Sequence, residues 1–147
     1  IVIDRAIQES GNTGRENFTV IHECFHQVLH PKCFKNRGAD YSKMCTQKSF
    51  KNDTERRKNM SAIDIIEYQA NFSAAAFLMP RKAVINTFSE VLGTVVKEQD
   101  LLSINNDINR AIGSTAKLFG VNYSALKYRL QSLKVLEKQT ATEEYIV

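Results

Sequence analysis

The sequence lacks any apolar run long enough to cross a membrane, although 43% of its residues are hydrophobic. It also lacks internal repeats and low-complexity tracts, which would indicate a solenoid or a disordered protein. Its 147 residues correspond to the length of one domain and include enough apolar side chains for a core. These observations predict a single soluble domain over residues 1–147, with no membrane partner.

Cysteine is scarce as well, with only Cys24, Cys33 and Cys45 in the chain. An odd number without the spacing of a zinc finger argues against a disulfide framework and favours a reducing compartment. The first residue is Ile1 and not Met, so we expect the chain to be the C-terminal part of a longer protein. The absence of a signal peptide from this sequence therefore does not locate the protein.

Residues 22–26 read HECFH, with two His four positions apart and a Glu after the first. Four residues turn an α-helix by about 400°, so His22 and His26 are expected on one face, close enough to bind one metal ion. Glu23 is rotated from that face by about 100° and would contact a water molecule beside the metal instead. The pattern predicts a zinc site with Glu23 as its general base.

Helical periodicity surrounds this pattern, because Phe18, Ile21, Phe25 and the pair Val28-Leu29 recur at the spacing of an apolar face. The two His would then lie at the core-facing edge of the helix. A buried imidazole pair without partners is unfavourable, and a metal ion satisfies both rings at once. The alternative is that HExxH arises by chance in an amphipathic helix.

A second segment could supply a third ligand. Residues 61–64 have the form of a capping box, and the helix that they open is expected to end at Met79-Pro80. Glu67 lies in this helix among small residues such as Ala70, where an ionised carboxylate requires a cationic partner. Open zinc sites commonly use two His and one Glu. The alternative for Glu67 is a solvated position on the outer face of the helix.

Two longer signatures carry a family resemblance. Residues 15–26 (RENFTVIHECFH) resemble the R-x-x-F-T-x-x-H-E-x-x-H signature of the ImmA/IrrE family of zinc metallopeptidases. Residues 67–80 are similar to that family's helix with E-x-x-A-N followed by L-M-P. Two signatures in this order are more specific than either alone. The resemblance implies that His22, His26 and Glu67 bind Zn2+ and that Glu23 is the catalytic base.

The resemblance also implies a fold and a function. The fold would be α+β and zincin-like, mostly helical, with a short strand or small sheet at residues 1–4 and a helical part around residues 118–130. The function would be zinc-dependent hydrolysis of a peptide bond in a specific protein substrate, such as a DNA-binding repressor. Members of the family are usually cytoplasmic and often tied to mobile elements or stress responses.

The sequence departs from the family pattern inside HExxH. Phe25 stands where members usually have a small residue, often Gly, and Cys24 replaces a commoner Leu. Neither change removes a ligand implied by the resemblance. The bulky Phe25 ring is expected to reshape the floor of the cleft, so it bears on catalysis and substrate fit more than on metal binding.

Residues 31–60 hold nine Lys or Arg and three Asp or Glu, a net charge of +6 within a chain of net charge +4. This segment lacks a sustained apolar period and joins the two predicted ligand helices. We therefore expect a long basic loop beside the metal that could serve as a lid or a substrate-binding surface. The alternative is a solvated loop without a partner.

His30 completes a series of three His at intervals of four, and the chain has no other His. Eight helical residues separate it from His22 by about 12 Å, too far for both to bind one metal ion. We therefore exclude His30 from the ligands and expect it at the C-terminal end of the helix or at the border of the cleft. The residue that stabilises the oxyanion stays open among Tyr68, His30 and Tyr41.

The C-terminal third has the outline of a helix-turn-helix. Residues 112–133 read as two helices around Gly120, and basic residues such as Lys127 and Arg129 could contact DNA phosphates. Two alternatives to a peptidase therefore stay open, a DNA-binding regulator and a metal-binding but catalytically inactive interaction module. The resemblance favours an αα corner, in which Arg129 packs its stem on the apolar stripe and pairs with a carboxylate. Direct nucleic-acid binding is thus not expected.

Overall fold

The computed structural model of the protein describes residues 5, 9, 11–31 and 61–138. Its named helices are α2 (Thr13–Leu29), α5 (Ala62–Leu78), α6 (Arg81–Leu92), α7 (Asn106–Leu118) and α8 (Tyr123–Ser132). No helix among the described residues is both long and apolar enough to span a bilayer.

The predicted, mostly helical character of the fold is confirmed. The described residues contain no strand, and one isolated parallel bridge joins Leu102 to Leu136. The strand expected at residues 1–4 and the basic segment, from residue 32 to residue 60, lie outside the described part. The sheet of the α+β prediction therefore stays a prediction.

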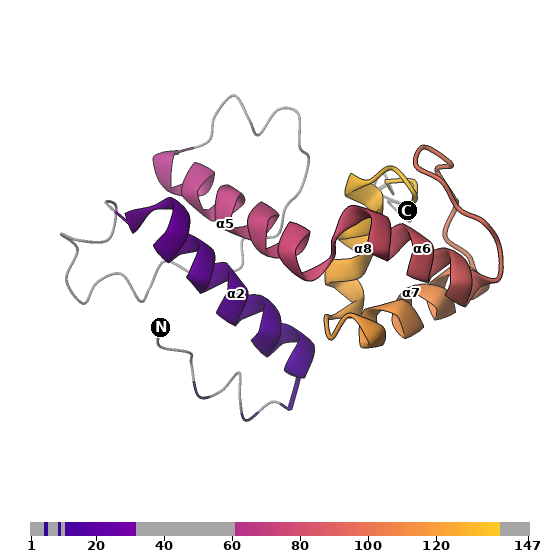
Figure 1. Ribbon diagram of the computed structural model, residues 1–147, viewed down its shortest axis with the longest axis horizontal. Helices are drawn as coiled ribbons and strands as arrows, with labels where there is room; N and C mark the ends of the chain where they lie inside the picture. Colours follow the sequence, from indigo (N-terminus) through magenta and orange to yellow (C-terminus); the bar gives the residue numbers. More distant parts are fainter. Residues whose placement is uncertain (1–4, 6–8, 10, 32–60, 139–147) are drawn as a thin grey trace, which may run out of the picture.

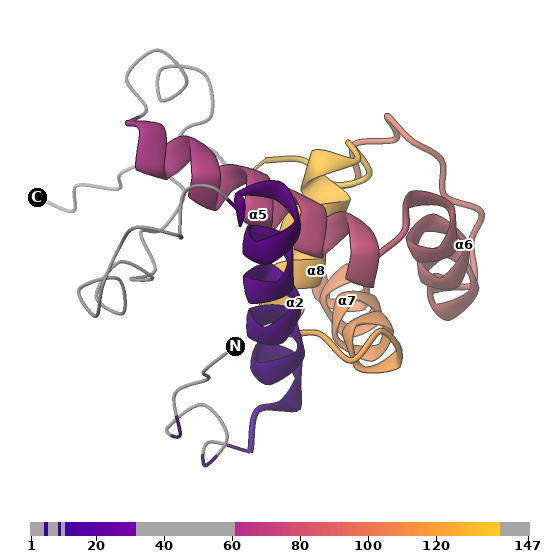
Figure 2. The ribbon, with the colours of Figure 1, turned by 60° about the vertical axis from the view of Figure 1, so that its left-hand side comes forward.

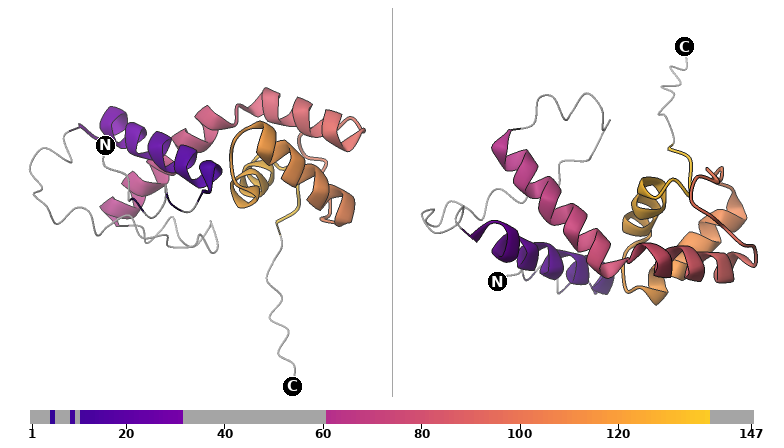
Figure 3. Two further views of the ribbon diagram at one scale, coloured as in Figure 1. Left: turned by 90° about the horizontal axis from the view of Figure 1, so that it is seen from below. Right: turned by 45° about the horizontal axis from the view of Figure 1, so that its top comes forward.

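The helices form two groups (Figure 1). α2 packs against α5 in the first group, and α7 packs against both α6 and α8 in the second. α5 leads through residues 79–80 directly into α6 and so joins the two groups (Figure 2 and Figure 3). The predicted ligands are thus confined to the first group.

Both helices of the first group begin at caps supplied by the sequence. The side chain of Asn12 accepts a hydrogen bond of 3.1 Å from the N–H of Arg15 at the start of α2. α5 begins with the predicted capping box, in which Ser61 and Asp64 each bond the other's N–H through their side chains, at 3.2 and 3.1 Å. α5 ends at Leu78 with Met79 as its C-cap, close to the predicted Met79-Pro80, because helical backbone is disfavoured in the residue before a proline.

The hydrophobic core lies in the second group. Phe88 of α6, Ile112 of α7 and Leu130 of α8 meet there and are fully buried. The buried members of this core are Met79, Val84, Phe88, Val96, Ile108, Ala111, Ile112, Ala116, Val121, Leu126, Leu130, Val135 and Leu136.

The two helices predicted for the C-terminal third are α7 and α8. α7 begins before the expected residue 112, because the side chain of Asn105 caps it by accepting a 2.9 Å hydrogen bond from the N–H of Ile108. The helices are joined at Gly120, whose φ of +60° belongs to the left-handed region that favours glycine.

Arg129 ties α8 to the end of α5. Arg129 is buried, and its Nε donates a 3.0 Å hydrogen bond to the carbonyl oxygen of Met79. Burial and, to a smaller extent, the charge of Arg81 lower the pKa of Arg129 from its ordinary value. The prediction that Arg129 packs into the fold is confirmed, but its head bonds a helix-terminal carbonyl rather than the expected carboxylate.

The N-terminal half of α2 is held by the turn between α7 and α8. Asn17 Nδ2 donates a 3.0 Å hydrogen bond to the carbonyl oxygen of Gly120. Gly14 lies so close to this turn that a Cβ atom there would be 2.6 Å from the carbonyl carbon of Val121. Only glycine allows that approach, so this contact fixes where α2 meets the second group.

Candidate metal site

Three predicted ligands converge between α2 and α5. The Nε2 atoms of His22 and His26 are 2.9 Å apart on α2. On α5, Glu67 Oε2 lies 3.3 Å from His22 Nε2, and Glu67 Oε1 lies 3.3 Å from His26 Nε2. The two imidazoles meet at nearly a right angle, with an interplanar angle of 87°. Glu67 therefore faces α2 and is not on the solvated outer face of α5, the alternative left open by the sequence.

The cluster is largely withdrawn from solvent. His26 is 1% exposed, His22 is 8% exposed, and the Glu67 side chain retains 21% of its exposure. Glu67 lies on the same face of α5 as the small residues Ala70 and Ala74, which are fully buried. Small side chains on this face let α5 approach α2 closely enough for the carboxylate to reach both imidazoles.

The environment of Glu67 favours its charged form. Burial alone would raise the pKa of this carboxyl. The hydrogen bonds and charges of His22 and His26 outweigh that effect and lower the pKa to about 2. The carboxylate is therefore ionised at neutral pH, and it sits in a confined place that requires a cationic partner.

Two of the three separations fit a tetrahedral metal ion, and the third, 2.9 Å between the Nε2 atoms of His22 and His26, is shorter than that geometry requires. Ligands about 2.0–2.1 Å from zinc at tetrahedral angles are about 3.3–3.4 Å from one another, which is the distance of Glu67 from each imidazole. Glu67 Oε1 is buried and makes no hydrogen bond of good geometry within the described residues. A metal ion at the meeting point would satisfy this oxygen and both facing nitrogens, so these side chains suit such an ion.

Glu23 also belongs to this cluster. Its carboxylate, with ring nitrogens of His22 and His26, forms a group whose potential ligand atoms lie within 4.8 Å of one another. Glu23 itself is partly buried on α2. This position suits either a ligand or a base beside the metal, and the division of roles between Glu23 and Glu67 stays a prediction.

His30 lies where the sequence predicted, at the C-terminal cap of α2, where its N–H donates to the carbonyl oxygen of His26 at 3.0 Å. It is 8% exposed, and its Nε2 lies 2.8 Å from Gln69 Oε1 on α5. Sequence reasoning missed Gln69. The available signal was a polar amide two positions after Glu67 in a helix rich in apolar residues.

The apolar pattern of α2 is only partly confirmed. Phe18 packs at the edge of the core, but Val28 and Leu29 are 69% and 46% exposed. The buried residues of this helix are Gly14, His22 and His26. The expectation that Val28 and Leu29 lie on the core-facing side is wrong, because the histidine side of α2 meets α5.

Phe25 is used in the same interface. Its ring packs edge to face on Phe77 of α5, with ring centroids 6.0 Å apart. The aromatic side chain inside HExxH thus contributes to the contact between the two ligand-bearing helices. Its neighbour Cys24 is a free, partly buried thiol.

Of the residues left open for the oxyanion, Tyr68 is 37% exposed and stacks on Phe72, with ring centroids 6.2 Å apart. Tyr41 lies outside the described residues. The role of Tyr68 stays a prediction.

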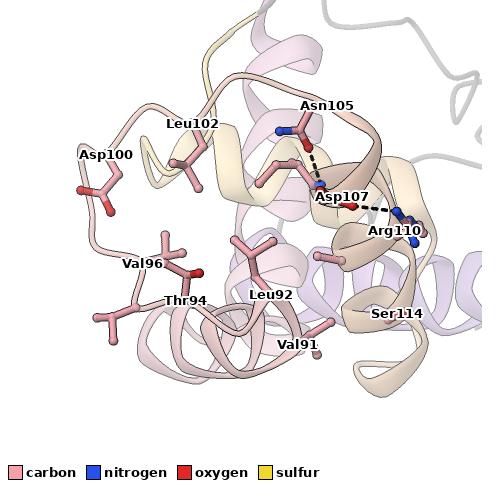
Figure 4. A pocket seen from close by; sticks show the side chains of 13 residues that line it. Val91, Leu92, Thr94, Val96, Asp100, Leu102, Asn105, Asp107, Arg110 and Ser114 are labelled. Carbon is pink, nitrogen blue, oxygen red and sulfur yellow. Dashed lines mark hydrogen bonds and ion pairs between the residues drawn. The ribbon is translucent and has the colours of Figure 1, made fainter.

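A separate hollow of about 530 Å3 lies between α6, α7 and the segment joining them (Figure 4). Several of its polar side chains have partners: Asn105 caps α7, and Asp107 pairs with Arg110. The predicted ligands and Glu23 do not line this hollow. The predicted chemistry is therefore located at the α2–α5 interface and not in this cavity.

Comparison with protein families gives a match over most of the chain. The family model of the IrrE N-terminal-like domain, peptidase family M78, matches residues 6–131. Neither curated proteins nor solved structures give a significant match. The matched range includes both signatures and every predicted ligand.

Proposed function

We propose that this chain, which belongs to the ImmA/IrrE family of metallopeptidase-type domains, is a zinc-dependent endopeptidase. The observation that carries this proposal is the convergence of His22, His26 and Glu67 at 2.9–3.3 Å between two helices. We further propose that the full fold is zincin-like, with residues near the N-terminus adding the small sheet.

The predicted ligand set matches a catalytic and not a structural zinc site. Two His and one Glu leave a fourth tetrahedral position open, whereas structural sites fill all four positions with protein ligands. When bound, zinc would act as a Lewis acid that polarises the peptide carbonyl and makes water more acidic.

The chain's own residues would then move the proton. Glu23 is close enough to the cluster to accept a proton from the attacking water. The same carboxyl can pass that proton to the nitrogen of the scissile bond. The leaving group then departs as a neutral amine and not as an amide anion. Glu67 stays ionised and holds the His side of α2 against α5 during both transfers.

The first experiment measures zinc content. We expect one Zn2+ per chain by elemental analysis, after the three thiols are blocked by alkylation so that they do not bind the metal. His22→Ala with His26→Ala, and separately Glu67→Ala, should lose it. Glu90→Ala, a change at an exposed glutamate of α6, is the matched control and should keep it. Stoichiometric zinc in the double His variant would reject the assignment.

The second experiment separates binding from catalysis. Glu23→Gln removes the proton acceptor with little change in shape, so zinc content should be kept while the cleavage rate falls by about 10²–10⁴-fold. Glu16→Gln, two helical turns earlier on α2, is the matched control and should cleave at the unmodified rate. A chain that binds zinc but cleaves nothing would instead be the inactive interaction module.

For the substrate, we propose a specific protein such as a DNA-binding repressor, as the family resemblance implies. The basic excess of residues 31–60 would favour an acidic or partly unfolded segment of that protein. Replacement of Lys51, Arg56, Arg57 and Lys58 by Ser should raise KM and weaken its salt dependence without loss of zinc. Unchanged kinetics across a salt series would indicate a solvated loop.

A further inference from the structure

The third histidine of α2 has a partner on the opposite helix. His30 is 8% exposed, and its Nε2 lies 2.8 Å from Gln69 Oε1. The contact joins the last turn of α2 to α5, two residues beyond Glu67 along the chain. His30 and Gln69, called the His30–Gln69 pair below, are outside the predicted ligand set.

The chemistry of this contact excludes His30 as a ligand through the same nitrogen. An amide oxygen only accepts hydrogen bonds, so Nε2 of His30 must carry the proton and donate it. A protonated ring nitrogen has no lone pair for a metal ion. The other ring nitrogen of His30 is buried without a hydrogen bond to any described residue. The pair is therefore a link between helices in which His30 is buried and Gln69 is exposed.

This link adds to two other contacts that hold the C-terminal half of α2 on α5, the Phe25 ring on Phe77 and the histidines on Glu67. The helix buries no large apolar side chain, since its buried residues are Gly14, His22 and His26. Its N-terminal half is fixed by Asn17, which bonds Gly120 at the turn between α7 and α8. His22 and His26 lie between that contact and the His30–Gln69 pair at the other end.

The Asn17 hydrogen bond and the His30–Gln69 pair restrain α2 on either side of the predicted ligands. A shift of about 0.5 Å in a residue that binds the metal directly is enough to impair a metal site. If the last turn of α2 moves away from α5, His26 and then His22 withdraw from Glu67, because all three histidines lie on one rigid helix. The hydrogen bond resists this movement without contacting the metal.

We propose that the His30–Gln69 pair is a positioning device that fixes the C-terminal end of α2 on α5 and thereby sets the distance from Glu67 to His22 and His26. The inference rests on the proposed metal site, and it adds residues that act through the ligands. Groups that hydrogen-bond a metal ligand directly typically change metal affinity by about 10- to 100-fold, and we expect the pair, which acts through the helices, at the lower end of that range.

The test is a double-mutant cycle on zinc affinity. The dissociation constant for Zn2+ is measured by competition with a chromophoric chelator at pH 7.5, for the unmodified chain, His30→Ala, Gln69→Ala and the double variant. Each single change should weaken binding by about 10-fold, and the double variant should be no weaker than the weaker single one. The double His22→Ala, His26→Ala variant measures how much zinc the cysteine thiols bind without the histidine site.

Two further variants separate positioning from folding. His30→Gln restores an N–H donor of similar reach and should recover most of the affinity, whereas Val28→Ala, at a 69% exposed site on α2, should leave it unchanged. Gln69 is exposed, so Gln69→Ala removes the acceptor with little loss of packing and stays informative if His30→Ala does not fold. Circular dichroism of each metal-free variant verifies that it is folded at the temperature of the titration.

The outcomes are distinct. An unmodified chain that binds zinc while Gln69→Ala binds it equally well overturns the His30–Gln69 pair and leaves the proposed function intact. Additive effects, or no recovery in His30→Gln, also overturn it. If the unmodified chain itself binds no zinc at the His site, both the proposed function and this inference fail.

Discussion

α2 and α5 hold three histidines and a glutamate between them, whereas α6, α7 and α8 enclose a continuous apolar core. In the first group the fully buried aliphatic side chains are small, Ala70 and Ala74, within the described residues. In the second group Phe88, Leu130 and their neighbours are fully buried. One chain therefore builds a polar interface from two helices of 17 residues and an apolar core from helices of 10 to 13 residues.

The difference separates the source of stability from the source of chemistry. Apolar burial contributes about 25 cal/mol per Å2 without a charged or hydrogen-bonding partner, so packing of its apolar side chains stabilises the second group. A buried carboxylate and imidazoles are favourable only when their charges and hydrogen bonds are satisfied. The α2–α5 interface is therefore expected to depend on its ligand, and to open more readily than the core.

The largest expected effect is on the core. Phe88→Ala removes a fully buried ring and should lower the free energy of unfolding by about 3–5 kcal/mol. Phe72→Ala, at a 55% exposed phenylalanine of α5, is the matched control and should change it by about 0.5 kcal/mol or less. Urea unfolding followed by circular dichroism measures both. Equal losses of unfolding free energy in the two variants would show that the second group does not hold the main hydrophobic core.

Metal removal tests the same contrast from the other side. Zinc at 100 times its dissociation constant should stabilise the structure that binds it by about 2.7 kcal/mol. On chelation, amide hydrogen exchange should accelerate in α2 and α5 and change little in α7 and α8. Mass spectrometry of peptic fragments resolves the two groups. Uniform acceleration over all helices would show that they unfold together, with no separate dependence on the metal.

The sequence predicts those features whose residues are close together. HExxH placed two histidines on one face, and Ser61 with Asp64 predicted the start of α5, because capping is decided within four residues. The contacts that hold the helices together were not predictable in this way. His30 meets Gln69 across 39 residues, Arg129 meets Met79 across 50, and Asn17 meets Gly120 across 103.

The burial of α2 shows the same limit. Val28 and Leu29 have the spacing of an apolar face, but periodicity identifies a face without identifying what covers it. The histidine side is the one that meets α5, and that choice depends on Glu67, which is distant in the sequence. The small residues around Glu67 indicated a third ligand, and the family signatures strengthened its pairing with HExxH.

A smaller effect is expected from enlarging the small residues that let α5 approach α2. Ala74→Leu adds bulk at a fully buried position on the Glu67 face and should lower the free energy of unfolding by about 1–3 kcal/mol. Because it should also push Glu67 away from the histidines, zinc affinity should fall. Ala83→Leu, at an exposed position on α6, is the matched control and should alter neither quantity. Unchanged zinc affinity in Ala74→Leu would show that close approach at this point does not determine the site.

The smallest effect is expected for nucleic acid. Arg129, a basic residue of α8 that could have contacted phosphates, is buried and donates to the Met79 carbonyl, so it is committed to the fold. Lys127→Ala with Arg129→Ala should therefore lower thermal stability, because a buried hydrogen bond from a charged group contributes about 1.5–3 kcal/mol. DNA affinity should stay at the weak, unspecific level of the unmodified chain.

Gel-shift titrations over random and operator-like duplexes at several salt concentrations measure this last quantity. Binding through phosphates would weaken steeply with salt, and each contact removed would reduce the slope of log affinity against log salt by about one. The two substitutions should leave that slope unchanged. Submicromolar binding at physiological salt that these substitutions weaken would make the second group a nucleic-acid interface. The division of the chain into a stabilising group and a reactive one would then need revision, because both groups would carry function.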